Sequence, residues 1–178
     1  MLLGLLPPIG LEIPCSCYAV DVPFEVNVLG IFRLDFKGGW KVRVEGNIRE
    51  GLGGVKLKMI GYEWTADSPV LGRVTISQAD VDTTPLSPLE ITSTLPPTFR
   101  NTMLLDFTVT IEKPPGGGPR WELSNTKTAR LMNDRLTVYP PQGSVYQLQE
   151  PIDLAHLNAR DTIVGQIHKL PMTVSHNP

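Results

Sequence analysis

The stretch FEVNVLGIFRLDF, residues 24–36, alternates apolar and polar side chains with a period of two. Its apolar side chains share one parity, which is broken only at Gly30: Phe24, Val26, Val28, Phe32, Leu34 and Phe36. A period of two over 13 residues predicts a β-strand with one buried face. Because a typical strand has only about 5–6 residues, we expect this one to bend at the central glycine, as strands do at a barrel corner.

The same alternation recurs along most of the chain. Gly38-Gly39 predicts a hairpin turn, after which residues 40–50 return as a strand. Further strands are predicted over residues 55–64, 70–78, 89–95, 103–111, 121–129, 131–139, 144–150 and 162–168. Residues 152–160 are expected to form a helical turn or an irregular crossing. No window shows the spacing of an amphipathic helix, so the sequence indicates an all-β protein of eight to ten strands.

A single-domain antiparallel β-barrel over residues 11–178 is the architecture that this pattern favours. The length of 178 residues fits one domain, and the 16 Gly and 17 Pro gather between apolar stretches, as turn residues do. Short links between successive strands are typical of barrels and sandwiches. Long strands favour the barrel, because closing the sheet removes exposed edges. A β-sandwich is the alternative.

The first ten residues, MLLGLLPPIG, are strongly apolar. No Lys or Arg precedes Arg33, so the positive region of a secretion signal is missing. The run is also much shorter than the roughly 20 apolar residues of a membrane-spanning helix. Because proteins avoid large exposed apolar patches, we expect residues 1–10 to be a lid over an opening of their own domain or an arm that docks on a partner subunit.

Charge and cysteine content exclude several classes of function. The chain has 16 basic and 18 acidic residues without a basic run, which argues against nucleic-acid binding and against a polybasic membrane site. Cys15 and Cys17 lie two residues apart, where a disulfide between them would be strained. Two thiols and three scattered histidines do not make a zinc site. We therefore expect reduced thiols, a cytoplasmic location, no metal and no cofactor.

Glu63 is the candidate catalytic residue. It shares the parity of Val55, Leu57 and Met59, which predicts that its carboxylate points into the apolar interior. Burial would raise the pKa of that carboxyl and suit it to general acid or base chemistry. A bulge or the end of the strand would instead turn the side chain to solvent.

Aromatic residues and two methionines are the candidate ligand-binding residues, because apolar pockets are commonly lined by such side chains. They are Met59, Tyr62, Trp64, Met103, Trp121 and Tyr146. The alternative is that they fill the core or form cross-strand pairs. The sequence contains no nucleotide-binding loop, calcium loop or nucleophile elbow.

In length, strand content and apolar N-terminus the chain resembles the small lipocalin-like barrels, which include cofactor-free cyclases of polyketide biosynthesis. The resemblance implies a hydrophobic pocket under an N-terminal segment, and cyclisation directed by the shape of the pocket. No motif carries it, so it assigns no role to a particular residue. The alternative is a non-enzymatic β-domain that self-assembles, for example as a homodimer, or docks through its apolar N-terminus.

Overall fold

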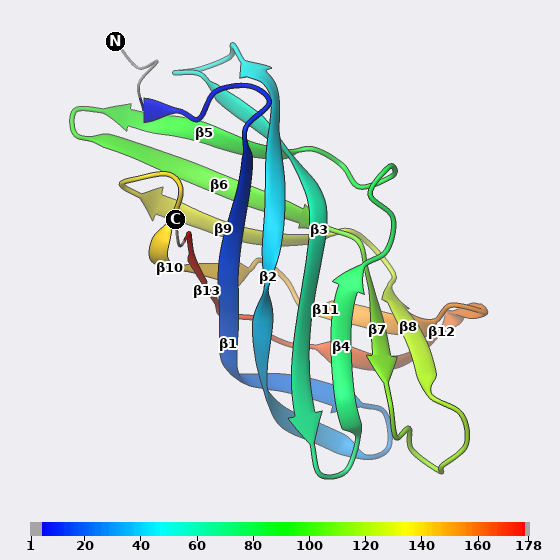
Figure 1. Ribbon diagram of the computed structural model, residues 1–178. Helices are drawn as coiled ribbons and strands as arrows, with labels where there is room; N and C mark the ends of the chain where they lie inside the picture. Colours follow the sequence, from blue (N-terminus) through cyan, green and yellow to red (C-terminus); the bar gives the residue numbers. More distant parts are fainter. Residues whose placement is uncertain (1–4, 177–178) are drawn as a thin grey trace.

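The computed structural model describes residues 5–176, which form one antiparallel sheet of thirteen strands (Figure 1). The strands are β1(Glu12–Val26), β2(Gly30–Ile48), β3(Gly54–Ser68), β4(Gly72–Gln78), β5(Ser87–Thr94), β6(Pro97–Leu105), β7(Phe107–Ile111), β8(Trp121–Asn125), β9(Ala129–Leu136), β10(Gln142–Leu148), β11(Ile152–His156), β12(Ala159–Ile167) and β13(Met172–Ser175). The described residues contain no α-helix, as predicted.

The pairing of the thirteen segments shows that they act as eight long strands. β1, β2 and β3 are continuous, whereas the other five long strands are each split in two: β4–β5, β6–β7, β8–β9, β10–β11 and β12–β13. For example, β6 pairs with β5 and β9, while its continuation β7 pairs with β4 and β8. Both β12 and β13 pair with β1, which closes the ring. The molecule is therefore an eight-stranded up-and-down barrel, and the predicted architecture is confirmed.

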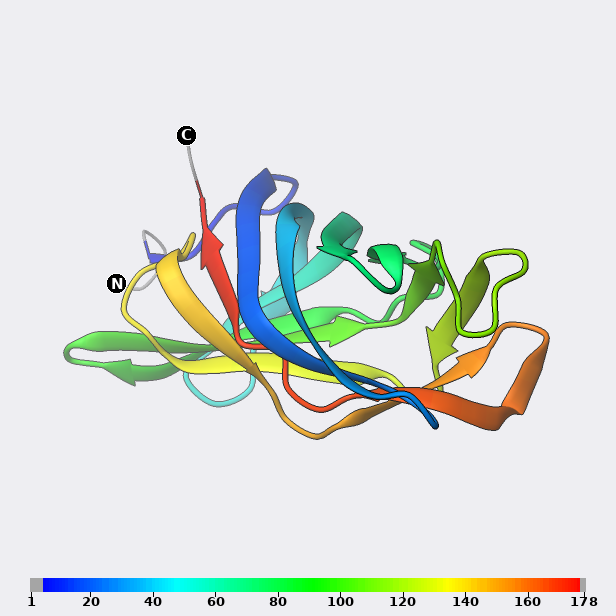
Figure 2. The ribbon, with the colours of Figure 1, turned by 90° about the horizontal axis from the view of Figure 1, so that it is seen from below.

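The splits divide the barrel into two halves along its length. β5, β6, β9, β10 and β13 complete the upper half, and β4, β7, β8, β11 and β12 complete the lower half (Figure 1). β1 to β3 run through both halves. Seen from below, the barrel is elongated in cross-section (Figure 2). We call the level of the splits the waist.

The stretch at residues 24–36 is a hairpin, and the predicted single strand is wrong. β1 ends at Val26 and β2 begins at Gly30, where φ is +102°. Phe24 lies opposite Phe32 in the ladder. Residues that face each other in an antiparallel pair point to the same side of the sheet. The alternation of apolar residues therefore stays in step on both sides of the turn, so the turn cannot be recognised from the alternation. Val28, at the turn, is fully exposed.

Gly38-Gly39 lies inside β2, and the predicted turn there is also wrong. A Cβ on Gly38 would overlap the backbone oxygen of Glu63, and one on Gly39 would lie 2.7 Å from the carbonyl oxygen of Cys15. The glycines are thus needed where three strands approach closely at the waist. Residues 152–160, expected to be irregular or helical, form β11 and the start of β12.

Polar side chains replace the backbone hydrogen bonds lost at the waist. Where Asp106 separates β6 from β7, Oδ1 of Asn125 accepts from the backbone N–H of Phe107 at 2.9 Å. Nδ2 of Asn125 donates to the carbonyl oxygen of Leu105, also at 2.9 Å. The Tyr62 hydroxyl donates to the carbonyl oxygen of Asp106 at 2.9 Å. Because buried polar groups need partners, these residues let the core continue through the waist.

Candidate functional site

A cavity of about 550 Å³ lies at the upper end of the barrel, and we call it the mouth pocket. It is bounded by residues 6–9, the end of β2, the turn into β3, and β5. Its apolar lining includes Leu6, Ile9, Ile48, Leu52, Val55 and Ile91. Cavities of about 300–1,000 Å³ with mainly apolar walls are typical of small-molecule sites.

The N-terminal segment forms one wall of this pocket. Leu5 and Leu6 are partly buried and pack against the core. The backbone N–H of Gly10 donates to the carbonyl oxygen of Val44 at 2.7 Å, and the N–H of Val44 donates to that of Leu11 at 3.0 Å. Residues 5–10 are therefore held against their own barrel. Residues 1–4 of the predicted segment lie outside the described residues, and its role as a lid or a docking arm stays a prediction.

A cluster of buried polar side chains lies in the upper half. The Tyr146 hydroxyl donates to Oδ1 of Asn101 at 2.6 Å, and the rings of Tyr146 and Trp40 meet edge-on at 5.4 Å. Tyr139, from the loop between β9 and β10, is also buried. Burial raises the pKa of the Cys15 thiol to about 11, so the thiol stays neutral.

Burial also raises the pKa values of three other ionisable side chains of this cluster, Cys17, Tyr139 and Tyr146. The pKa of Cys17 rises to about 12. Neutral thiols and phenols can donate or accept hydrogen bonds, but these are poor nucleophiles. The cluster is thus suited to binding rather than to covalent chemistry.

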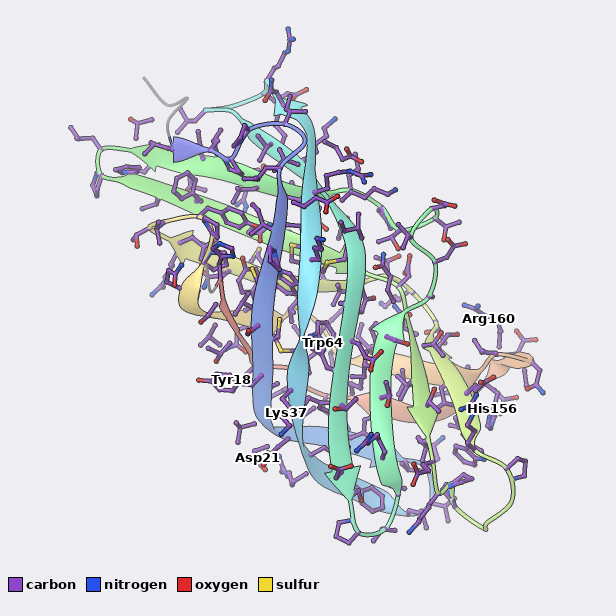
Figure 3. All side chains as sticks on the ribbon, viewed as in Figure 1. Tyr18, Asp21, Lys37, Trp64, His156 and Arg160 are labelled. Carbon is purple, nitrogen blue, oxygen red and sulfur yellow. The ribbon has the colours of Figure 1, made fainter. Side chains whose placement is uncertain are left out.

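The predicted ligand-binding residues do not form one site. Met59, Trp64, Met103 and Tyr146 are fully buried in the core. Tyr62 stacks on Trp64, with ring centroids 4.8 Å apart. Figure 3 labels Trp64, which lies near the waist. Contact of these side chains with a ligand stays a prediction.

Trp121 lies apart from the other candidates, at the lower end of the barrel. Its ring meets the ring of His156 edge-on at 4.7 Å, and Figure 3 labels His156 there. Both residues border a second, more polar cavity of about 460 Å³, whose charged residues include Arg120 and Glu122.

The predicted inward orientation of Glu63 is wrong. Gly61 pairs with Lys41 and Met59 with Val42, so Ile60 is an extra residue in β3. This bulge reverses the parity, because one additional residue turns every later side chain to the opposite face. Tyr62 and Trp64 therefore point inward and Glu63 is exposed. A catalytic role for Glu63 remains untested, but the burial from which it was inferred is absent.

Trp40, Tyr139 and Asn101 are buried members of the upper half that no sequence pattern singled out. Trp40 shares the inward parity of Val42 and Val44, and the expected turn at Gly38-Gly39 obscured this signal. Tyr139 lies in a loop and had no periodic signal. Over residues 5–176, no group of three or more His, Cys, Asp or Glu side chains is placed to hold a metal ion. The same part of the chain has no helix long and apolar enough to cross a membrane.

The closed ring of eight long strands, with an apolar pocket at one end, places the molecule among lipocalin-like β-barrels in architecture. Its structure is similar to that of DynF from the dynemicin biosynthesis pathway of Micromonospora chersina, with a TM-score of 0.78. The two share 17% sequence identity, and the match covers 97% of this chain and 83% of DynF. At this identity the similarity shows the fold alone. No protein-family profile and no curated protein sequence matches the chain.

Proposed function

We propose that this protein binds a hydrophobic small molecule in the upper half of its barrel, with the mouth pocket as the entrance. The observation that carries the proposal is the apolar cavity of about 550 Å³ between residues 6–9 and the rim of the barrel. An apolar ligand there would be removed from water on several sides, which is the main source of affinity for such molecules.

We further propose that the ligand is a biosynthetic intermediate and that the protein acts as a cofactor-independent cyclase of a polyketide-like substrate. The shared fold with DynF, a protein of a biosynthesis pathway, supports the biosynthetic setting. The buried residues of the described chain include no charged side chain, but they include neutral hydrogen-bonding groups. Such an interior favours catalysis by holding a flexible substrate in a reactive conformation. The binding free energy then offsets the rotational entropy that the substrate must lose before it reacts.

The test is titration with an environment-sensitive apolar dye, combined with measurement of the mass of the protein in solution. We expect saturable uptake of one dye per chain by a monomer or dimer. A chain that starts at Leu11 serves as the comparison, and we expect its affinity for the dye to fall because one wall of the mouth pocket is missing.

Absence of dye uptake, together with large assemblies that grow with protein concentration, would contradict the proposal and favour a structural β-domain. Native mass spectrometry of the purified protein gives a second measurement, because a tightly bound apolar molecule survives purification. A bound molecule with fused carbon rings or a linear carbon chain would support the biosynthetic setting. Conversion of a bound linear molecule to a cyclic product on incubation tests the cyclase activity itself.

A further inference from the structure

The second cavity, of about 460 Å³ at the lower end of the barrel, has no part in the proposed function, and we call it the lower pocket. Its walls come from the loop between β7 and β8, the first residues of β8, and the turn between β11 and β12. The backbone N–H of Leu157 donates to the carbonyl oxygen of Glu122 at 3.1 Å and holds this turn against β8. The volume lies in the range of small-molecule sites.

Trp121 supplies the flat apolar surface of the lower pocket. It packs against the core and its ring meets His156 edge-on at 4.7 Å, yet it remains partly exposed. The other two tryptophans, Trp40 and Trp64, are only 2% and 0% exposed. A ring that is fixed by its neighbours and borders a cavity can stack on the C–H groups of a ligand at little cost in side-chain entropy.

Polar side chains of both kinds lie beside this ring. Nη2 of Arg120 is 3.3 Å from Oε1 of Glu122, with 66% and 48% of the two side chains exposed. Because the pair is so exposed, each partner keeps hydrogen-bonding capacity for a ligand. Asn158 adds an amide, which both donates and accepts. Apart from His156, the wall has no other ionisable side chain among the described residues, so the charges of the pair cancel.

The loop between β7 and β8 presents mainly backbone to the pocket. Gly116, Gly117 and Gly118 have φ of +80°, +77° and +85°, and a Cβ on any of them would meet no atom within 4 Å. Such φ values are accessible mainly to glycine. Because Gly117 lines the pocket, a ligand can approach the backbone N–H and carbonyl groups closely on this side.

These features together select a neutral ligand with an apolar face and several hydroxyl groups. An anion would be repelled by Glu122 and a cation by Arg120. A wholly apolar ligand would displace water from the polar wall without replacing its hydrogen bonds. A hydroxyl both donates and accepts, so it can bond to a guanidinium, a carboxylate or an amide. A pyranose sugar combines these properties, since C–H groups occupy the faces of its ring and hydroxyls lie around the edge.

We propose that the lower pocket binds the pyranose ring of a neutral sugar, stacked on Trp121, with its hydroxyl groups bonded to Arg120, Glu122 and Asn158. This second site lies at the opposite end of the barrel from the mouth pocket, so it does not depend on the proposed function. The barrel then has an apolar site at one end and a polar site at the other.

The test is isothermal titration calorimetry with methyl β-D-glucopyranoside, whose ring hydroxyls are all equatorial and leave only C–H groups on the faces. We expect one site per chain with a Kd of about 1 mM, an affinity typical of a ligand of this size. Sorbitol has the hydroxyls without the ring, whereas cyclohexanol has the ring with a single hydroxyl. Both should bind roughly tenfold more weakly or not at all.

Trp121→Ala should weaken sugar binding roughly tenfold or more, whereas Trp121→Phe, which keeps a flat ring, should stay within about threefold of the wild type. Arg120→Gln should weaken it roughly three- to tenfold, because a neutral amide makes weaker hydrogen bonds than a guanidinium. Arg73→Gln is the matched control. Arg73 is 60% exposed and lies 3.3 Å from Asp67, away from the pocket, so its loss should leave the affinity unchanged.

Absence of saturable binding up to about 50 mM sugar, or equal affinity for sorbitol, would overturn the inference. A folded Trp121→Ala variant that binds the sugar like the wild type would also overturn it. If that variant does not fold, Arg120→Gln decides, because this exposed side chain is not part of the core. Displacement of the apolar dye by the sugar would place the sugar in the mouth pocket and contradict a second site. Dye uptake without sugar binding would overturn the inference and leave the proposed function standing.

Discussion

Asn125 takes the place of a β-ladder at Asp106, the residue at which β6 passes into β7. Its side chain accepts from the N–H of Phe107 and donates to the carbonyl oxygens of Leu105 and Lys127, at 2.9, 2.9 and 2.8 Å. Asn125 itself is only 5% exposed. One buried amide therefore holds the two halves of a long strand in line.

Asn125→Ala should lower the free energy of unfolding by about 3 kcal/mol, because it leaves buried backbone groups without partners. Asn158→Ala, at an exposed turn, is the control and should change the free energy by less than about 0.5 kcal/mol. Urea unfolding measures both. Equal effects of the two substitutions would show that the waist does not depend on this amide.

Gly38→Ala should destabilise the barrel by about 3 kcal/mol or more, since the added methyl group would overlap the backbone of Glu63. Gly46→Ala lies on the same strand, and its added Cβ would meet no atom within 4 Å. We expect that control to be neutral or to stabilise by up to about 1 kcal/mol. Thermal unfolding of the two variants distinguishes close approach from a general cost of replacing glycine in β2.

The buried thiols should make stability fall at alkaline pH. Burial raises the pKa of Cys15 from 9.0 to about 11 and that of Cys17 from 9.0 to about 12. Above pH 9 the thiols of the unfolded chain lose their protons, while those of the folded chain keep them. Ionisation therefore stabilises the unfolded state relative to the folded state. Their contribution is complete below pH 9 and is lost between about pH 9 and 12.

Between pH 9 and 10 the free energy of unfolding should therefore fall by about 1–2 kcal/mol through these two groups. The variant in which both cysteines are alanine should be less stable overall but should lack this part of the decrease. Urea unfolding at several pH values measures it. An equal decrease in the wild type and the variant would mean that the thiols are not buried in solution.

Leu52→Asp should weaken dye binding roughly five- to tenfold, because it places a charge in the apolar wall of the mouth pocket. Leu52 is 49% exposed, so the substitution should have little effect on stability. Val70→Asp is the matched control, since Val70 is 59% exposed and lies in the turn between β3 and β4. Similar losses in both variants would place the bound dye elsewhere.

The period of two is a local property, and for this reason the all-β class and the antiparallel barrel could be predicted from residues 24–36 and the similar stretches that follow. Turn positions were harder to predict, because Phe24 and Phe32 face the same side on opposite strands. The Gly38-Gly39 pair shows a related difficulty. Glycine permits a turn, but it also permits close strand approach, and only the neighbouring strands distinguish the two.

The site was decided by tertiary structure. The extra residue Ile60 in the pairing of β3 turned Glu63 outward and Tyr62 inward, and no local pattern marks that bulge. Cys15 and Tyr139 lie more than a hundred residues apart in the sequence, and both belong to one core because β13 pairs with β1 on one side and with β10 on the other. Alternation along a strand determines which faces are buried, whereas pairing between strands determines which buried groups meet and which of them lack partners.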